Sequence, residues 1–205
     1  MAAVTATEDL GLRARKKQAT REALSGAALR LALERGPDNV RVEDIAAAAG
    51  VSPRTYNNYF SSREEAICAL RLDRALDLAT AIRNRPAREP LDRAIIAAFT
   101  RRHSPEPDVK AMRLIMESPA LRAEFIKTIA QVERPLIEAI AERTGTDPDR
   151  DLFPQMMATM IFGALRAATE HWLRSKPRRL YSDVLREALQ VIAPAARAFE
   201  RRASS

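Results

Sequence analysis

The chain has 205 residues, of which 46% are hydrophobic and 30% charged, a composition typical of a globular protein with a sizeable buried core. Its formal net charge of +7 favours an acidic partner such as nucleic acid. The single cysteine, Cys68, excludes an intrachain disulfide framework, and no apolar run approaches the roughly 18 residues of a membrane span.

The N-terminal part of the chain predicts a disordered tail followed by a basic helix. Residues 1–12 are small or polar and have no helical period, so we expect them to be disordered. An apolar stripe then predicts a helix over residues 13–35, which ends at the strong stop signal Gly36-Pro37. Basic side chains crowd the start of this helix: Arg13, Arg15, Lys16, Lys17 and Arg21.

The excess of positive charge is concentrated near the N-terminus. Between residues 13 and 63 there are ten basic and five acidic residues. This cluster is either an ordinary solvated helix face or a clamp on DNA phosphates, and a clamp would give salt-dependent affinity. We predict phosphate contacts at Lys16 and Lys17.

Residues 41–65, RVEDIAAAAGVSPRTYNNYFSSREE, have the spacing of two short helices joined by a tight turn. The apolar side chains of residues 42–49 share one helix face, and Gly50 follows where a left-handed turn favours glycine. Ser52 and Pro53 are suited to start the second helix as N-cap and first-turn proline. We expect this second helix to run from residue 53 to residue 60.

Polar side chains are left on the outer face of the second helix, because Tyr56 and Phe60 are four residues apart and are expected to pack inward. Arginine and asparagine can each form two hydrogen bonds to a base edge, a threonine methyl can contact thymine, and hydroxyls commonly bind phosphate. A helix-turn-helix places the start of its second helix in the major groove. The predicted DNA contacts here are Ser52, Arg54, Thr55, Asn57, Asn58 and Tyr59.

The third helix of this region has its own start signal. Ser61 and Ser62 are each followed three residues later by a glutamate, which is a capping-box pattern. Arg63 lies beside the free N–H groups of this helix start and is predicted to anchor a phosphate. On spacing alone, an ordinary helical hairpin is the alternative, since helix-turn-helix shapes also occur in proteins that do not bind DNA.

The stretch AAAAGVSPRTYNNYFSSREEAI resembles the signature of the TetR (tetracycline repressor) family, with a motif match over about residues 13–70. The resemblance implies a DNA-binding domain over residues 13–61 and a ligand-binding and dimerisation domain over residues 62–205.

The sequence departs from the family pattern at three positions. Arg41 replaces the usual capping threonine and has no side-chain oxygen with which to cap the helix. Its positive charge is predicted to reach a phosphate instead. Asn57 replaces a common aromatic residue and is expected to bind a base. Arg63 replaces a lysine, which keeps the charge but changes the geometry.

The remainder of the chain predicts an all-α fold of about nine helices, without strand-like alternation. The further helices are expected at residues 62–83, 91–103, 108–117, 119–143, 149–175 and 181–202. The last two carry apolar residues on two faces each, and a second apolar face must also be buried. The resemblance implies that these two helices form a homodimer interface, with a pseudo-palindromic DNA operator as the partner.

The resemblance also implies a small-molecule site among the middle helices. Aromatic and methionine side chains suit an adaptable apolar cavity, although each is more often a core residue. The candidates for this site are Phe99, His103, Met112, Met116, Phe125, Met160, Phe162 and Trp172.

The sequence contains no catalytic, metal or cofactor motif, so we expect neither an enzyme nor a metal or cofactor. The expected function is a ligand-responsive repressor that an apolar effector releases from DNA, located in the cytoplasm at the nucleoid and without a membrane partner. The alternative is a helical small-molecule binding protein with a vestigial DNA head.

Overall fold

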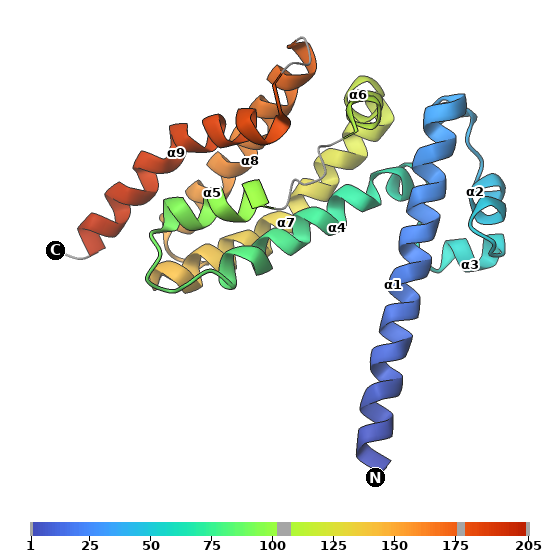
Figure 1. Cartoon of the computed structure of the whole chain (residues 1–205), viewed down its shortest axis with the longest axis horizontal. Helices are drawn as coiled ribbons and strands as arrows, with labels where there is room; N and C mark the ends of the chain where they lie inside the picture. Colours follow the sequence, from blue (N-terminus) through green and yellow to red (C-terminus); the bar gives the residue numbers. More distant parts are fainter. Residues whose placement is uncertain (1, 102–107, 176–178, 204–205) are drawn as a thin grey trace. The chain divides into compact units, whose positions relative to one another are not determined.

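The computed structural model describes residues 2–101, 108–175 and 179–203, and all regular structure in these ranges is helical, which confirms the all-α prediction (Figure 1). The elements are α1 (Ala2–Arg35), η1 (Pro37–Asn39), α2 (Val42–Ala48), α3 (Pro53–Asn57), α4 (Arg63–Arg83), α5 (Leu91–Arg101), α6 (Val109–Glu117), α7 (Pro119–Thr144), α8 (Leu152–Arg174) and α9 (Tyr181–Ala203). Among the described helices, none combines the length and apolar composition needed to cross a membrane.

Two helices near the N-terminus have other bounds than the sequence predicts. Helix α1 begins at Ala2, whereas the predicted helix begins at residue 13. Extending an existing helix needs no new nucleation, and the alanines and leucines of this stretch have high helix propensity. Helix α3 ends at Asn57 rather than Phe60, because the Tyr59 N–H bonds back to the Tyr56 carbonyl at 2.8 Å and tightens the last turn.

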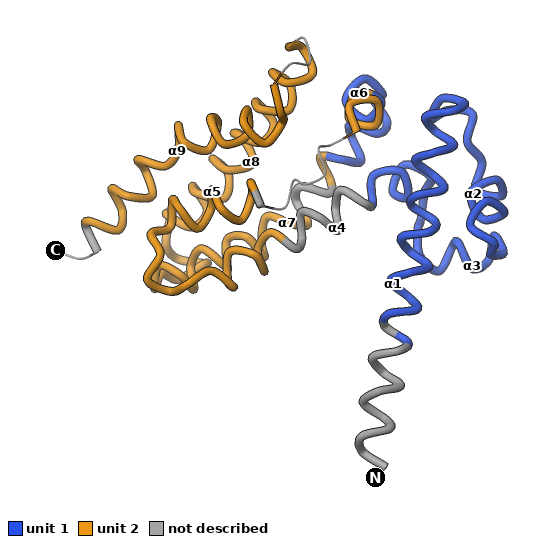
Figure 2. The backbone as a smooth tube through the Cα atoms, in the orientation of Figure 1, with its two compact units in different colours: residues 1–71, 114–125 blue, residues 72–113, 126–205 orange. Residues whose placement is uncertain are grey.

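The chain forms two compact units whose limits differ from the predicted domains (Figure 2). Unit 1, the head, comprises residues 1–71 and 114–125, and unit 2 comprises residues 72–113 and 126–205. The boundary expected after residue 61 is therefore replaced by one inside α4. The turn between α6 and α7 also belongs to the head, although it is more than forty residues further along the chain.

The core of the head explains why residues 114–125 belong to it. Ile115 and Leu121 are 1% and 0% exposed and lie in one apolar cluster with side chains of α1, α2, α3 and α4. Cys68 is buried in the same cluster, and its sulfur lies 3.7 Å from the Leu121 carbonyl oxygen. This confirms the prediction that Cys68 is a core residue. The Ser25 hydroxyl joins α1 to α4 by donating a 2.7 Å hydrogen bond to the Ala66 carbonyl.

In unit 2, helix α9 packs along both α8 and α5 (Figure 1). The rings of Phe153 and Phe199 are stacked with centroids 3.6 Å apart, and Trp172 meets Tyr181 edge-on at 5.2 Å. The start of α5 is tied to α9 by polar contacts, because Glu200 accepts a 2.8 Å hydrogen bond from the Leu91 N–H.

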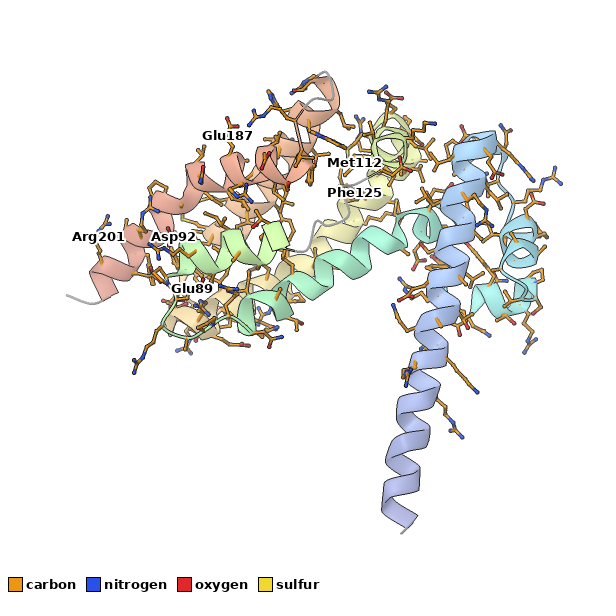
Figure 3. All side chains as sticks on the ribbon, viewed as in Figure 1. Glu89, Asp92, Met112, Phe125, Glu187 and Arg201 are labelled. Carbon is orange, nitrogen blue, oxygen red and sulfur yellow. The ribbon has the colours of Figure 1, made fainter. Side chains whose placement is uncertain are left out.

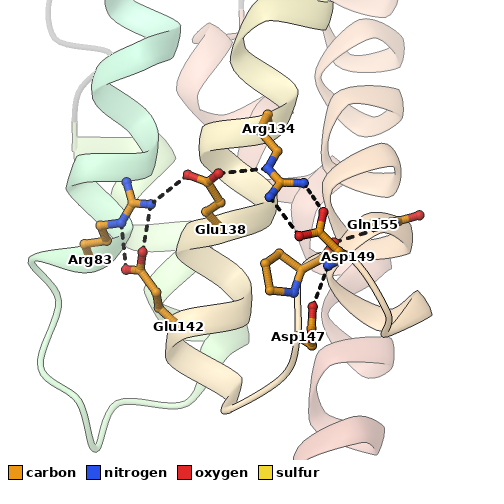
Figure 4. Close-up of polar contacts among 8 residues, drawn as sticks. Arg83, Arg134, Glu138, Glu142, Asp147, Asp149 and Gln155 are labelled. Carbon is orange, nitrogen blue, oxygen red and sulfur yellow. Dashed lines mark hydrogen bonds and ion pairs between the residues drawn. The ribbon is translucent and has the colours of Figure 1, made fainter.

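A chain of ion pairs on the surface of unit 2 joins α4, α7 and the loop before α8 (Figure 4). Arg83 donates to Glu142 at 2.7 Å and lies 3.8 Å from Glu138. Arg134 bridges Glu138 at 2.8 Å and Asp149 at 2.5 Å. The hydrogen bond from Arg83 lowers the pKa of the Glu142 carboxyl, and the one from Arg134 lowers the pKa of Asp149.

Candidate nucleic-acid interface

The turn between α2 and α3 has the predicted construction. Gly50 has a φ of 70°, in the left-handed region, and its N–H bonds to the Ala47 carbonyl. The Val51 N–H then bonds to the Ala46 carbonyl at 3.0 Å, and the Val51 side chain packs against the head core. The two short helices therefore keep a fixed geometry.

Helix α3 is capped by Ser52, as predicted. The Ser52 hydroxyl accepts a 3.1 Å hydrogen bond from the Thr55 N–H and also lies 2.9 Å from the Thr55 hydroxyl. Both hydroxyls are thus engaged with each other at the start of the helix. The Thr55 methyl makes no hydrogen bond and can contact a thymine methyl.

The inner face of α3 is held from three sides. Tyr56 and Phe60 are 0% and 2% exposed, with ring centroids 5.7 Å apart. The Tyr56 hydroxyl donates to the Ser62 carbonyl at 2.7 Å, and burial, followed by the nearby Glu65 and Glu64 carboxylates, raises the pKa of this phenol. Arg21 of α1 lies 4.6 Å above the Phe60 ring and donates to the Tyr59 carbonyl.

The outer face of α3 is free to contact a ligand. Arg54, Asn57 and Asn58 are exposed, and their side chains form no hydrogen bond or ion pair with any residue that the structure describes. Tyr59 is half-buried in the turn that follows. Guanidinium and amide groups held in this way on a rigid frame have the chemistry needed to bind base edges in a major groove.

Most of the basic residues predicted near the DNA are exposed, but one is engaged by aromatic residues of the head. Lys16 and Lys17 are exposed on α1, and Arg41 is exposed at the start of α2. Arg41 occupies the N-cap position of α2, and its side chain forms no capping hydrogen bond, as predicted. Arg21, from the same basic cluster, differs from these exposed residues because it is half-buried, lies over the Phe60 ring and donates to the Tyr59 carbonyl. Sequence patterns gave no sign of this, since the contact joins residues 38 positions apart.

Arg63, which was predicted to anchor a phosphate, makes several contacts within the head. Its Nε donates to Glu64 at 2.7 Å, and its Nη1 donates to the carbonyls of Asp38 at 2.9 Å and Val40 at 3.2 Å. Its Nη2 lies 3.6 Å from the Asp38 carboxylate. The guanidinium therefore binds the loop between α1 and α2. This loop is distant in sequence and is brought next to Arg63 by folding.

The predicted capping box at the start of α4 is present in a shifted form. Ser62 accepts a 3.0 Å hydrogen bond from the Glu65 N–H, as an N-cap should. The Glu65 carboxylate returns not to Ser62 but to Ser61, whose N–H and hydroxyl each donate to it at 2.8 Å. Glu64 instead pairs with Arg63.

The structure does not gather the predicted ligand-binding residues into one unit. Met116 and Phe125 pack against the core of the head, whereas Phe99, Met112 and Trp172 are buried in unit 2 (Met112 and Phe125 are labelled in Figure 3). Trp172 also braces the end of unit 2 by donating to the Arg179 carbonyl at 3.2 Å. Met160 and Phe162 are half-buried in α8, and His103 lies outside the described residues.

Comparison with known proteins assigns both parts of the chain. The model described as "Bacterial regulatory proteins, tetR family" matches residues 25–67, and "MftR C-terminal domain" matches residues 85–197. The chain belongs to the TetR family. It is similar to the HTH-type transcriptional regulator TcmR of Streptomyces glaucescens, with 34% identity over 88% of this chain and 82% of that protein. It is also similar to the transcriptional regulator MftR of Mycobacterium tuberculosis, with 29% identity over 87% of this chain and 91% of that protein.

Solved structures of TetR-type regulators share the fold. The fatty acid degradation regulator FadR of Bacillus halodurans superimposes with a TM-score of 0.56 and 19% identity, covering 85% of this chain and 94% of that chain. A tetR-family transcriptional regulator of Streptomyces coelicolor superimposes with a TM-score of 0.54 and 18% identity, covering 91% and 88%. This TetR-family chain is therefore a DNA-binding transcriptional regulator.

Proposed function

We propose that this TetR-family regulator is a repressor that binds a pseudo-palindromic operator as a homodimer and is released by an apolar small molecule. The observation that carries the proposal is the outer face of α3, where Arg54 and Asn57 are exposed and unengaged on a helix that is capped and braced from within. A vestigial head would have no reason to keep this frame, so the alternative of a binding protein without DNA function is disfavoured.

The proposed dimer interface is the second apolar face of α8 and α9. Leu152, Met156 and Val191 are 67%, 50% and 77% exposed, which is unusual for large apolar side chains. On α8 this face continues through the half-buried Met160 and Gly163 at helical spacing. A second copy of the same helices is the occupant that would cover this face in a two-fold dimer.

The operator follows from that symmetry. A two-fold dimer presents two copies of α3, and recognition helices of this kind enter successive major grooves about 34 Å apart or somewhat more. The bound DNA should therefore contain two inverted half-sites.

The proposed effector is apolar because the side chains available in unit 2 are apolar. Phe99, Met112 and Trp172 are buried there, and Met160 and Phe162 are half-buried. A ligand can release the protein from DNA only if it binds the DNA-incompetent state more tightly than the competent one.

The experiment that tests the proposal is selection of duplexes from a random DNA library, followed by fluorescence anisotropy of the selected duplex. We expect an inverted repeat, a complex with two protein chains and an affinity that falls steeply with salt. Apolar compounds are then screened for those that raise the melting temperature of the free protein and dissociate the complex. Failure to bind any duplex at low salt would refute the DNA-binding function, and binding as a monomer would refute the dimer.

A further inference from the structure

The Arg63 guanidinium makes its contacts in three directions within the head. It reaches the Glu64 carboxylate on its own helix, and the carbonyls of Asp38 and Val40 on the loop between α1 and α2. We propose that Arg63 is a positioning residue that fixes this loop, and that Arg41, the residue after Val40, makes the phosphate contact in its place. The proposal rests on the proposed DNA binding of the head.

The charges around Arg63 disfavour a phosphate there. Glu64 lies at 2.7 Å and the Asp38 carboxylate at 3.6 Å, so two negative groups surround one positive group. A DNA phosphate would have to approach this net negative cluster and displace hydrogen bonds that are already formed. Arg63 is also only 32% exposed at its side chain, because the loop covers it.

Arg41 has the opposite environment. It is exposed, and its side chain forms no hydrogen bond or ion pair with the part of the chain that the structure describes. Its backbone is nevertheless held firmly, because its carbonyl accepts the Ile45 N–H at 3.2 Å. An unpaired guanidinium on a fixed backbone can bind a phosphate without first breaking other contacts.

The loop connects these two arginines mechanically. The Val40 side chain is 1% exposed in the head core, and the Val40 carbonyl is one of the acceptors of Arg63. Arg63 therefore holds the peptide that leads directly into Arg41. A lysine at position 63 would keep the charge but, with one nitrogen, could not reach Glu64, Asp38 and Val40 together.

The two roles predict different salt dependences. The plot of log K against log salt has a negative slope. Removing a side chain that binds phosphate makes this slope less steep by about 0.9 for each phosphate released. Removing a positioning residue lowers the affinity without changing the slope. The variants are Arg41→Ala, Arg63→Ala and Arg63→Lys, with Arg88→Ala as a control that removes an exposed arginine from unit 2. Each is titrated with the duplex selected by the wild-type protein and with a scrambled duplex, at several salt concentrations.

We expect Arg41→Ala to reduce the slope and to weaken both duplexes alike. Arg63→Ala should weaken binding with the wild-type slope, Arg63→Lys should restore only part of the affinity, and Arg88→Ala should match the wild type. If Arg63→Ala reduces the slope as much as Arg41→Ala does, and Arg63→Lys restores full affinity, Arg63 is a phosphate contact and the proposal is overturned.

Hydrogen exchange of the free protein provides a readout that does not depend on DNA. Amides of residues 36 and 38–41 should exchange faster in both Arg63→Ala and Arg63→Lys, and should be unchanged in Arg41→Ala. Unchanged exchange in Arg63→Ala would overturn the positioning role even if DNA binding is confirmed. A wild-type protein that binds neither duplex would refute the proposed function instead.

Discussion

The Tyr56 hydroxyl donates a 2.7 Å hydrogen bond to the carbonyl of Ser62, which joins α3 to the residue that caps α4. The same tyrosine ring is fully buried and meets Phe60 at 5.7 Å. One side chain thus anchors α3 both to the head core and to the next helix, and the orientation of the outer face depends on it.

Replacing Tyr56 by phenylalanine removes only the hydroxyl and keeps the ring. We expect a loss of about 0.5–1.5 kcal/mol in the free energy of unfolding, towards the lower end because the Ser62 carbonyl also accepts the Ala66 N–H. Urea denaturation measures the loss. Tyr59→Phe is the control, because Tyr59 is half-buried and its hydroxyl has no bond among the described residues. Equal losses in the two variants would contradict the anchoring role.

The bases should be selected by Arg54 and Asn57. Alanine at either position should reduce discrimination at one base pair by about 1–3 kcal/mol, since each side chain can form two hydrogen bonds to a base edge. Competition against single-base variants of the selected duplex measures this. Arg30→Ala, which removes another exposed arginine of the head, should leave the preference intact. A preference unchanged in Arg54→Ala would show that α3 does not read the DNA.

Lys16 and Lys17 should contribute affinity without sequence preference. Their joint replacement by alanine should weaken binding to the selected and scrambled duplexes equally. It should also make the dependence of log K on log salt less steep by about 0.9 for each phosphate that these lysines bind. Anisotropy titrations over a range of salt test this, with Lys110→Ala in unit 2 as the control. A wild-type salt dependence in the double variant would show that these lysines belong to an ordinary solvated helix face and do not bind phosphate.

The exposed apolar face of α8 and α9 should hold two chains together. Met156→Glu or Val191→Glu places a charge where an apolar contact is proposed, so we expect the sedimentation velocity mass to fall to that of one chain and operator affinity to fall with it. Ile126→Glu makes the same kind of change at a residue of α7 that is 61% exposed, and it should remain a dimer. Dimers in both Met156→Glu and Val191→Glu would place the interface elsewhere.

The ion pair between Arg83 and Glu142 should stabilise unit 2 only when the carboxylate is charged. Because Arg83 lowers the pKa of Glu142 in the folded protein, the stabilisation is present above the unfolded pKa and is lost as the pH falls through the folded value. The pair is exposed, so Glu142→Gln should cost about 0.2–1 kcal/mol at neutral pH. Urea denaturation should find this difference at pH 7, and the difference should shrink as the pH falls below the ordinary pKa of a glutamate.

A control separates this pair from the general loss of a negative charge. Glu43→Gln removes an exposed carboxylate that forms no ion pair with any described residue. It should therefore have little effect at neutral or at acidic pH. A difference for Glu142→Gln that persists in acid would assign its cost to packing instead of charge.

Local chemistry made the helix-turn-helix predictable from sequence. Gly50, Ser52 and Pro53 act within a few residues of their own positions, so their effects on the turn and on the cap of α3 do not depend on the rest of the fold. The outward direction of Arg54 and Asn57 followed from helical spacing for the same reason. The helix limits of α4 and α9 were also predicted closely, because clear caps and prolines mark them.

Contacts between distant residues were not predictable in the same way. Arg63 donates to carbonyls 25 and 23 residues earlier, and local spacing gave no sign of these hydrogen bonds. The part that residues 114–125 play in the head was not predictable for the same reason, since Ile115 and Leu121 carry no local sign that they complete its core.

The inclusion of residues 114–125 in the head has a consequence for protein engineering. A fragment that ends at residue 71 would lack Ile115 and Leu121 and leave the apolar surfaces around Cys68 open to water. Residues 1–71 are therefore not expected to fold stably when they are moved alone into another protein. A chimaera that exchanges only the N-terminal segment with a relative must also carry over the α6–α7 turn, or match its side chains to the new core.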